Sequence, residues 1–388
     1  MRRRIVLLCC LGMAAFGIVL TVLGASLPAL IARFAIDKTQ AGALLSLMSF
    51  GVLAGSLVFG PIVDWRGYRG MLLLSFAAIV VGLEAVAFAP TLAVLRAAVL
   101  LIGFTGGLVN GGVNALSVDI ATGADRASLV TYVGAFFGVG AAGVPFVLAT
   151  FGNAFPHSAI LAASGALVVI PLALTAATEF PPSKQPHGFP ADEVKGLLRD
   201  RALLLIGLML FLESGVETTA GGWIPTLFAE ELDVSVTRAP LYLSLFWLGL
   251  LIGRLALSAV LQRASAVRVM TLSIALATIA SLLLVSTGSA AVGGASVFLL
   301  GAGFASTFPV MFAVIGNRYA QLSGTALSLA MGMALAGGML LPWLTGVMAT
   351  ARGLRASFLI VPVGLVLLAS LLMTLSRRVA PTAFATES

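Results

Sequence analysis

Charged residues, cysteines and histidines are scarce in this 388-residue sequence: only 10% of the residues are charged, and cysteine and histidine occur twice each. The two cysteines, Cys9 and Cys10, are adjacent in one apolar stretch, so they predict neither a disulfide framework nor a metal site. The composition is 60% hydrophobic, with a mean hydropathy of +1.11. There is too little charge to cover a soluble domain, so the sequence predicts a protein whose solvent is the lipid bilayer.

Motifs that carry enzyme chemistry are also missing. The two histidines, His157 and His187, fall in expected loops, and no phosphate-binding loop, zinc motif or nucleophile elbow occurs. Glycine-rich runs such as Gly103-Phe-Thr-Gly-Gly lie inside apolar blocks, where they favour helix packing. The net charge of +7 comes from basic residues between apolar blocks, so it does not indicate nucleic-acid binding. We expect neither an enzyme nor a nucleic-acid partner, and no metal or cofactor.

Apolar blocks of the length that a membrane-spanning helix needs recur along the whole chain. They cover residues 5–34, 41–63, 71–89, 92–117, 128–150, 158–178, 202–228, 239–262, 267–287, 291–316, 323–349 and 355–376. A polar connector separates the sixth block from the seventh. The sequence therefore predicts an all-α membrane protein with twelve transmembrane helices: a six-helix bundle over 1–178, a cytoplasmic linker over 179–201 and a second six-helix bundle over 202–388.

Basic residues are divided unevenly between the two sides of the membrane. With both termini in the cytoplasm, fifteen lysines and arginines lie at cytoplasmic segment ends and six at the opposite ends. Cytoplasmic loops carry such an excess, so we expect a multi-pass protein of the cell (inner) membrane with both termini cytoplasmic. Arg2, Arg3 and Arg4 precede the first apolar block as in a signal peptide. That block continues past Pro28 without a clear cleavage site, which favours a retained first helix.

The two halves share a pattern of glycine and proline. Gly24 and Pro28 correspond to Gly221 and Pro225 at an offset of 197 residues. Further pairs at 197 or 198 residues are Gly140 with Gly337, Pro145 with Pro342, Gly51 with Gly249, and Gly55 with Gly253. Agreement across several helices indicates an internal repeat. Two repeated six-helix bundles with a substrate site between them are the plan of a transporter that works by alternating access.

Two glutamates, Glu213 and Glu217, lie one helical turn apart inside the seventh apolar block. A carboxylate at membrane depth costs about 2.5 kcal/mol or more, and such residues usually face a cavity or a proton relay. Their Cβ atoms would be about 5–6 Å apart, so the two carboxyls would titrate as a coupled pair that can share one proton. The pattern predicts a cation-coupling site. The alternative is that one glutamate only bonds a neighbouring backbone group or arginine.

The segment after the second block reads Gly60-Pro-Ile-Val-Asp64-Trp-Arg66-Gly67-Tyr-Arg69. It resembles the G-x-x-x-D-R-x-G-R-R signature of the major facilitator superfamily, with Trp65 in the place of the first arginine. The resemblance implies a conformational latch in which Asp64 accepts from basic groups and Gly67 permits a tight turn. The expected latch residues are Asp64, Arg66, Arg69 and Arg254. For Arg254, snorkelling to the membrane surface is the alternative.

Further stretches resemble one branch of that superfamily, the fucose–galactose–glucose–H⁺ symporters with the sodium-dependent glucose transporter-like proteins. They are Asn110-Gly-Gly-Val-Asn114, Gly215-Val-Glu217-Thr-Thr-Ala-Gly-Gly-Trp223, Trp247–Arg254, Gly301–Pro309 and Gly337–Gly346. The resemblance implies that the first, fourth, seventh and tenth helices line a central cavity. This sequence departs from the branch at Asn110, where an acid is common. An asparagine bonds a hydroxyl but carries no proton, so the coupling role would fall to the seventh helix.

The resemblance places a set of polar side chains in that cavity. The expected substrate contacts are Asn110, Asn114, Glu217, Trp223, Thr218 and Ser306, and the expected cation-coupling residues are Glu217 and Glu213. Two alternatives stay open. The asparagines can instead join helices by hydrogen bonds, and the indole of Trp223 can lie in the aromatic belt at the membrane surface rather than stack on a sugar.

The sequence and the resemblance together predict a monomeric secondary active transporter that couples H⁺ or Na⁺ to symport of a small polar solute such as a sugar. The alternative is a proton-coupled exporter of amphipathic or drug-like compounds. The nearly apolar first helix and a partial match of residues 134–145 to the antiporter motif of drug exporters favour that alternative. A membrane sensor that does not transport is a third possibility, which the short connector disfavours.

Overall fold

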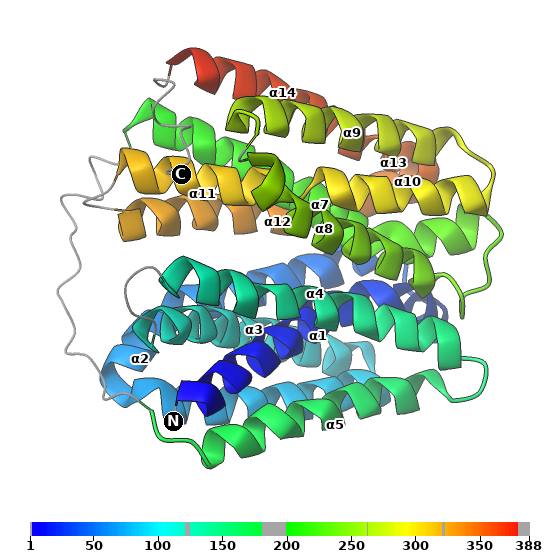
Figure 1. The fold of residues 1–388 in the computed structure, drawn as a ribbon. Coiled ribbons are helices and arrows are strands. Elements are labelled where there is room, and N and C mark those ends of the chain that lie inside the picture. Colours follow the sequence, from blue (N-terminus) through cyan, green and yellow to red (C-terminus); the bar gives the residue numbers. More distant parts are fainter. Residues whose placement is uncertain (1, 121–124, 181–198, 262, 320–322, 379–388) are drawn as a thin grey trace. The chain divides into compact units, whose positions relative to one another are not determined.

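A computed structural model describes residues 2–120, 125–180, 199–261, 263–319 and 323–378 (Figure 1). Over these residues the chain forms helices and connecting turns and no strand. The helices are α1 (Arg2–Phe34), α2 (Lys38–Phe88), α3 (Leu92–Ile120), α4 (Asp125–Phe151), α5 (His157–Ala176), α7 (Arg201–Glu231), α8 (Pro240–Leu261), α9 (Ala266–Ser286), α10 (Ala290–Gly303), α11 (Thr307–Arg318), α12 (Ser323–Arg352), α13 (Leu354–Ser357) and α14 (Ile360–Arg378). Within the described residues, twelve helical segments are long and apolar enough to cross a membrane. The expected all-α architecture with twelve spans is confirmed.

Four of the expected blocks differ in detail from the helices of the structure. The second and third blocks form one helical run, α2, which turns at Gly67 with φ 72° and ψ 172°. This is a conformation that glycine adopts without strain. The tenth block, expected to be one helix over 291–316, is broken between α10 and α11. The twelfth begins with the separate short turn α13.

The break in the tenth block has a local cause. Pro309 lies in the first turn of α11, where its missing amide hydrogen costs nothing. In an unbroken helix the same proline would deprive the carbonyl of Ala305 of its partner, and its ring would clash with that carbonyl. Phe304 instead closes α10 by donating its backbone amide to the carbonyls of Leu300 and Gly301. The chain resumes as α11 three residues later.

The chain divides into two compact units. Unit 1 comprises Met1–Ile36, Leu44–His187 and Ser235–Ser244, and unit 2 comprises Asp37–Ala43, Gly188–Val234 and Leu245–Ser388. Compared with the expected halves, the first turn of α2 is counted with unit 2 and the start of α8 with unit 1. Lys38 accordingly pairs with Glu230 in unit 2 at 2.9 Å, and Ser244 donates to the carbonyl of Ala142 in unit 1 at 3.0 Å. Most of the expected linker lies outside the described residues.

Each unit is held by close backbone contacts at glycines. In unit 1, α1 lies along α4, and a Cβ on Gly140 would overlap the carbonyl of Ala14. In unit 2, α7 lies along α12, and a Cβ on Gly337 would overlap the carbonyl of Phe211. Both members of the contact are shifted by the same 197 residues. The internal repeat read from the sequence is therefore a repeat of helix contacts, made where small residues let backbones approach closely.

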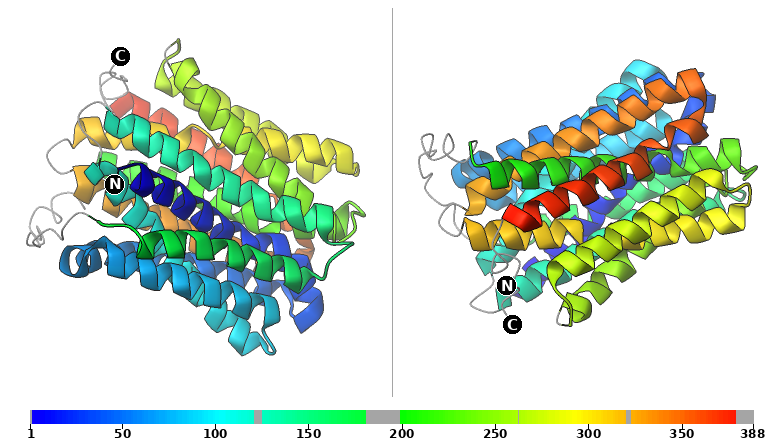
Figure 2. Two further views of the ribbon diagram at one scale, coloured as in Figure 1. Left: turned by 60° about the horizontal axis from the view of Figure 1, so that its bottom comes forward. Right: turned by 90° about the horizontal axis from the view of Figure 1, so that it is seen from above.

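A second contact repeats at an offset of 198 residues. A Cβ on Gly51 would lie 2.8 Å from the carbonyl of Leu100 in unit 1, and a Cβ on Gly249 would overlap the carbonyl of Phe298 in unit 2. Other helices of each unit pack on the central ones. In unit 2, α14 lies along both α7 and α9 (Figure 2). In unit 1, α1 also contacts α3 and α5. The result is that α1 and α7 are the central helices of their units.

Candidate functional site

The largest departure from an apolar interior lies on α7. The side chain of Glu213 is 0% exposed, and neither of its carboxyl oxygens has a hydrogen-bond partner among the residues that the structure describes. Glu217 follows one helical turn later on the same face, with a buried Oε2 that also has no partner. Asp200 begins this helix, where its Oδ1 accepts from the amides of Ala202 and Leu203. The expected acid pair therefore exists inside unit 2 as a fully buried carboxyl, Glu213, and a partly buried one, Glu217.

Three further polar side chains belong to this buried cluster. Arg254 of α8 interacts electrostatically with both glutamates, and its Nε is buried without a partner. Ser306 and Thr307, at the break between α10 and α11, are both 0% exposed, and their hydroxyls are unbonded. Thr307 lies beside the Glu213 carboxyl, but no hydrogen bond of acceptable geometry joins them. Ser306 is included because it directly precedes Thr307 in the helix break. We call the following five residues the unit 2 cluster: Glu213, Glu217, Arg254, Ser306 and Thr307.

The helix break accounts for the two unbonded hydroxyls. Serine and threonine inside a helix usually bond the carbonyl one turn back, as Thr345 does with Leu341 in α12 at 2.8 Å. Ser306 occupies the N-cap position of α11 yet makes no side-chain cap bond, and Thr307 is the first helical residue. Both hydroxyls are therefore left for a partner outside their own helix.

The expected substrate contacts of unit 1 lie together on α3. Asn114 donates its Nδ2 to the backbone carbonyl of Asn110 at 2.9 Å and to Asn110 Oδ1 at 3.0 Å. Its Nδ2 also lies 4.0 Å from the sulfur of Met13 on α1. Within the described part of the chain, Asn110 Nδ2 and Asn114 Oδ1 have no protein partner. The pair thus presents one donor and one acceptor side by side, which is what a hydroxyl group requires.

Two other expected contacts on α7 are already engaged within unit 2. Thr218 donates its hydroxyl to the carbonyl of Ser214 at 2.6 Å. Trp223 is 0% exposed, and its Nε1 donates to the carbonyl of Pro342 on α12 at 3.1 Å. An indole buried in this way stabilises the α7–α12 contact. Its role in substrate binding stays a prediction.

The expected latch residues lie in different places. Arg69 donates to the carbonyl of Ala176 at the end of α5 at 2.8 Å, and the neighbouring Tyr68 donates to Asp119 Oδ2 on α3 at 2.7 Å. The side chains of Asp64 and Arg66 lie outside the described ones. Sequence reasoning missed the proximity of Arg254 to the acid pair. The available signal was that a charged residue at membrane depth usually has a charged partner.

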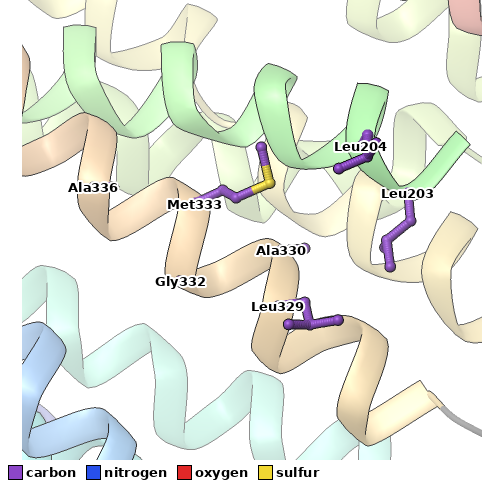
Figure 3. A pocket seen from close by; sticks show the side chains of 7 residues that line it. All are labelled: Leu203, Leu204, Leu329, Ala330, Gly332, Met333 and Ala336. Atoms are coloured by element: carbon purple, nitrogen blue, oxygen red, sulfur yellow. The ribbon is translucent and has the colours of Figure 1, made fainter. Parts of the chain in front are cut away.

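An apolar cavity of about 270 Å³ opens beside the first turns of α7 (Figure 3). It is lined by Leu203, Leu204, Leu329, Ala330, Gly332, Met333 and Ala336. The side chain of Met333 extends from α12 toward α7 (Figure 3), where its sulfur would contact a Cβ on Gly207. The cavity can hold an aliphatic or aromatic group, but its lining offers no polar side chain.

The described residues contain no cluster of the side chains that usually bind a metal ion. Across those residues, no three histidine, cysteine, aspartate or glutamate side chains lie close enough to hold a metal ion together. The unit 2 cluster offers two acids, one arginine and two hydroxyls. They can bind, hold and exchange a small charged species.

Twelve apolar helices built as two repeats around buried polar groups define a membrane transporter. The chain belongs to the Major Facilitator Superfamily, whose family model matches residues 7–334 and 206–387. It is therefore a transporter of small molecules and not an enzyme. An uncharacterized transporter, y4wD of Sinorhizobium fredii, is 24% identical over 350 residues, which cover 89% of this chain and 91% of that protein.

Solved structures share the fold at low sequence identity. A mutant of the nucleoside transporter NupG superposes with a TM-score of 0.80 at 17% identity, covering 96% of this chain and 99% of that one. A D-xylose-proton symporter superposes with a TM-score of 0.79 at 17% identity, covering 99% of each chain. At such identities the likeness establishes the fold, and the substrate has to be argued from the residues.

Proposed function

We propose that this transporter couples a monovalent cation, H⁺ in the first instance, to symport of a small polar solute such as a sugar. The observation that carries the proposal is the unit 2 cluster, in which two carboxyls share the surroundings of one arginine. With both acids ionised, the cluster has one negative charge in excess. An uncompensated buried charge is strongly unfavourable, so binding one cation there gives a large, conformation-dependent gain.

The proposed roles follow the two units. In unit 1, Asn110 and Asn114 bind substrate hydroxyls through the amide nitrogen and oxygen that they leave open. In unit 2, Glu217 and Glu213 carry the coupling cation. Ser306, Thr218 and Trp223 are the further proposed substrate contacts.

A sugar is favoured over other polar solutes by three observations. The asparagine pair offers a donor and an acceptor for one hydroxyl. The helix motifs resemble those of the fucose–galactose–glucose–H⁺ symporter branch. One structure of the same fold is a D-xylose-proton symporter, which supports a pentose or hexose as the first substrate to try.

The transport cycle that we propose is alternating access, with bundles 1–178 and 202–388 as the moving parts. Asp64, Arg66, Arg69 and Arg254 are the proposed latch residues. The excess of basic residues on one side supports insertion in the cell (inner) membrane with both termini in the cytoplasm. We propose a monomer as the working unit, since each chain carries both repeats.

Uptake of labelled D-xylose, D-glucose and L-fucose into proteoliposomes tests the proposal. Wild-type protein should concentrate one of these sugars when an inward proton gradient is imposed. Glu217→Gln removes the ionisable group with little change in shape, so concentrative uptake should fall to the level of empty vesicles. Exchange of labelled for unlabelled sugar at equal ion concentrations needs no gradient, and it should survive in this variant.

The matched control is Glu84→Gln, because Glu84 is another carboxylate within a membrane span but belongs to unit 1. Its concentrative uptake should equal that of wild type. A Glu217→Gln protein that still concentrates sugar would remove Glu217 from the coupling role. Failure of all sugars to exceed empty vesicles, in uptake and in exchange, would exclude sugars as substrates.

The alternative function, proton-coupled export of amphipathic compounds, is favoured by one observation. The cavity beside α7 is lined by aliphatic side chains and small residues, which suits an apolar group better than a sugar. Under this alternative, amphipathic amines added to the detergent-purified protein would trigger proton release. That release would be lost in Glu217→Gln. Proton release with amines and none of the sugar responses would favour the exporter.

A further inference from the structure

The unit 2 cluster holds more unsatisfied oxygen atoms than one proton can serve. Five oxygen atoms are buried without a hydrogen-bond partner in the described part of the chain: both carboxyl oxygens of Glu213, the Oε2 of Glu217 and the hydroxyl oxygens of Ser306 and Thr307. A buried polar group without a partner costs about 1–3 kcal/mol. Native structures seldom leave several such atoms together, so this concentration points to a ligand that satisfies several oxygens at once.

A proton alone does not fill that role. Protonating Glu213 creates one O–H donor, which can satisfy one acceptor. In the arrangement observed, no hydroxyl donates to the other carboxyl oxygen, so that oxygen would stay unbonded among the described residues. A hard metal cation, in contrast, binds several carboxylate and hydroxyl oxygens simultaneously.

The charge of the cluster limits the kind of cation. The two carboxylates and Arg254 sum to one negative charge, which a single monovalent cation neutralises. A divalent ion would leave an excess positive charge buried, which is as unfavourable as an excess negative one. Oxygen donors also disfavour the softer transition metals, which select imidazole and thiolate.

The helix break supplies the geometry that a cation site at membrane depth needs. Transporters bind ions where a helix is interrupted, because the interruption frees polar groups that a continuous helix would bond internally. Here the interruption lies between Gly303 and Thr307. It brings the hydroxyl of Thr307 beside the carboxyl of Glu213 and leaves that of the adjacent Ser306 unbonded, while Arg254 is left to neutralise Glu217.

We infer that the unit 2 cluster is a sodium site, with Glu213, Ser306 and Thr307 as its side-chain ligands and Arg254 as the counter-ion of Glu217. The inference rests on the proposed function because it names the coupling ion of the same cluster. Sodium and a proton then compete for the same site, because either one neutralises its single negative charge. The site would lie entirely within unit 2.

Binding of ²²Na⁺ to the detergent-purified full-length protein tests the inference directly. Wild type should bind about one ion per chain saturably, with displacement by NaCl and none by choline chloride. Glu213→Gln should abolish binding because it removes the charge that holds the ion. Thr307→Val keeps the side-chain shape and removes one ligand, so the affinity should fall by about tenfold or more.

The matched control is Thr219→Val. Thr219 is another fully buried α7 hydroxyl without a partner, but it projects from the opposite face of the helix to Glu217. Its ²²Na⁺ affinity should equal that of wild type. Absence of saturable binding in folded, monodisperse wild type would overturn the inference. So would wild-type affinity in both Glu213→Gln and Thr307→Val.

Sugar exchange at equal NaCl on both sides of the membrane separates the two proposals. Exchange without ²²Na⁺ binding would overturn the sodium site and leave proton-coupled symport standing. Binding of ²²Na⁺ without exchange of any sugar would overturn the substrate class and leave the ion site in place.

Discussion

Unit 1 has apolar side chains at the positions that correspond to the buried acids of unit 2. At the offset of 197 residues, Glu213 corresponds to Phe16 and Glu217 to Leu20. Phe16 is buried against Phe137, with ring centroids 5.6 Å apart. The central helix of unit 1 thus packs with an aromatic pair, whereas that of unit 2 carries two glutamates with buried carboxyl oxygens that lack a partner among the described residues.

The reverse holds for the asparagine pair. At the offset of 198 residues, Asn110 corresponds to Phe308 and Asn114 to Phe312. These two rings stack edge to face in α11 at 5.8 Å. Ser306 and Thr307 of the helix break correspond to Leu108 and Val109 inside the continuous helix α3. The two repeats therefore share their glycine contacts but differ in their polar side chains. Unit 1 has the asparagine pair, and unit 2 has the acid pair with the hydroxyls of the helix break.

The largest expected effect comes from disrupting the glycine contacts that the two units share. Gly337→Val and Gly140→Val each place side-chain atoms where a carbonyl of the neighbouring helix lies. Overpacking against side chains costs about 1–3 kcal/mol, and a backbone contact yields less readily. We expect either variant to lose most of its monodisperse yield in size-exclusion chromatography.

The controls for this pair are glycines of the same two helices. Gly143 of α4 and Gly332 of α12 have no atom within 4 Å of an added Cβ. Alanine at either position should leave the yield and the thermal unfolding temperature close to wild type. Equal yields from the valine variants and these controls would show that the repeated contacts do not hold the units.

The next effect concerns the asparagine pair on α3 of unit 1, whose counterparts in unit 2 are phenylalanines. Asn114→Ala removes one hydrogen-bond partner of a substrate hydroxyl, so the KM for the transported sugar should rise about tenfold. The maximal rate should change little. Ser117→Ala, one turn further along α3, serves as the control, because the hydroxyl that it removes donates to the carbonyl of Val113 and lies beside the thiol of Cys9. An unchanged KM in Asn114→Ala would assign the asparagines to helix–helix contacts.

How far the sequence predicts this molecule also differs between its parts. Span number and helix class follow from hydropathy, because only helices of about 20 residues satisfy their backbone in lipid. The glycine pattern predicted an internal repeat, and the contacts of Gly140 and Gly337 became visible only in the structure. The glutamate pair was recognised from its spacing alone.

What the sequence did not yield depends on tertiary contacts. The partner of the acid pair, Arg254, is 37 residues from Glu217, and no local pattern joins them. The helix break was missed although Pro309 was visible, because hydropathy is uniform across residues 291–316. The engagement of the Trp223 indole with Pro342 likewise requires the packing of α12 on α7.

A smaller effect tests another difference between the units. Trp223 corresponds to the buried Ser26 of unit 1, whose hydroxyl has no partner. Trp223→Phe removes the hydrogen bond to Pro342 and should lower stability by about 1 kcal/mol, seen as a lower unfolding temperature. Trp343→Phe is the control, since that indole is 41% exposed. Loss of sugar binding at unchanged stability would instead support Trp223 as a substrate contact.

The smallest expected effect is a pH dependence at the start of α7. Partial burial alone would raise the pKa of Asp200, but the amides of Ala202 and Leu203, the side chain of Tyr319 and the charge of Arg318 outweigh it, so the pKa is lowered. Arg318 Nη2 lies 3.7 Å from Asp200 Oδ2. A carboxyl with a lowered folded-state pKa contributes stability above its unfolded pKa of about 3.9, and this contribution is lost as the pH falls through the folded value.

Asp200→Asn isolates this contribution because asparagine caps a helix about as well as aspartate. Wild type should unfold at a higher temperature than the variant at pH 6, by a margin that shrinks as the pH is lowered below about 4. The ion pair is partly exposed, so the margin should be within about 1 kcal/mol and should decrease in high salt. A margin that stays constant from pH 6 to pH 3 would show that the carboxylate charge does not stabilise α7, and that the cap alone starts the helix on which the acid pair lies.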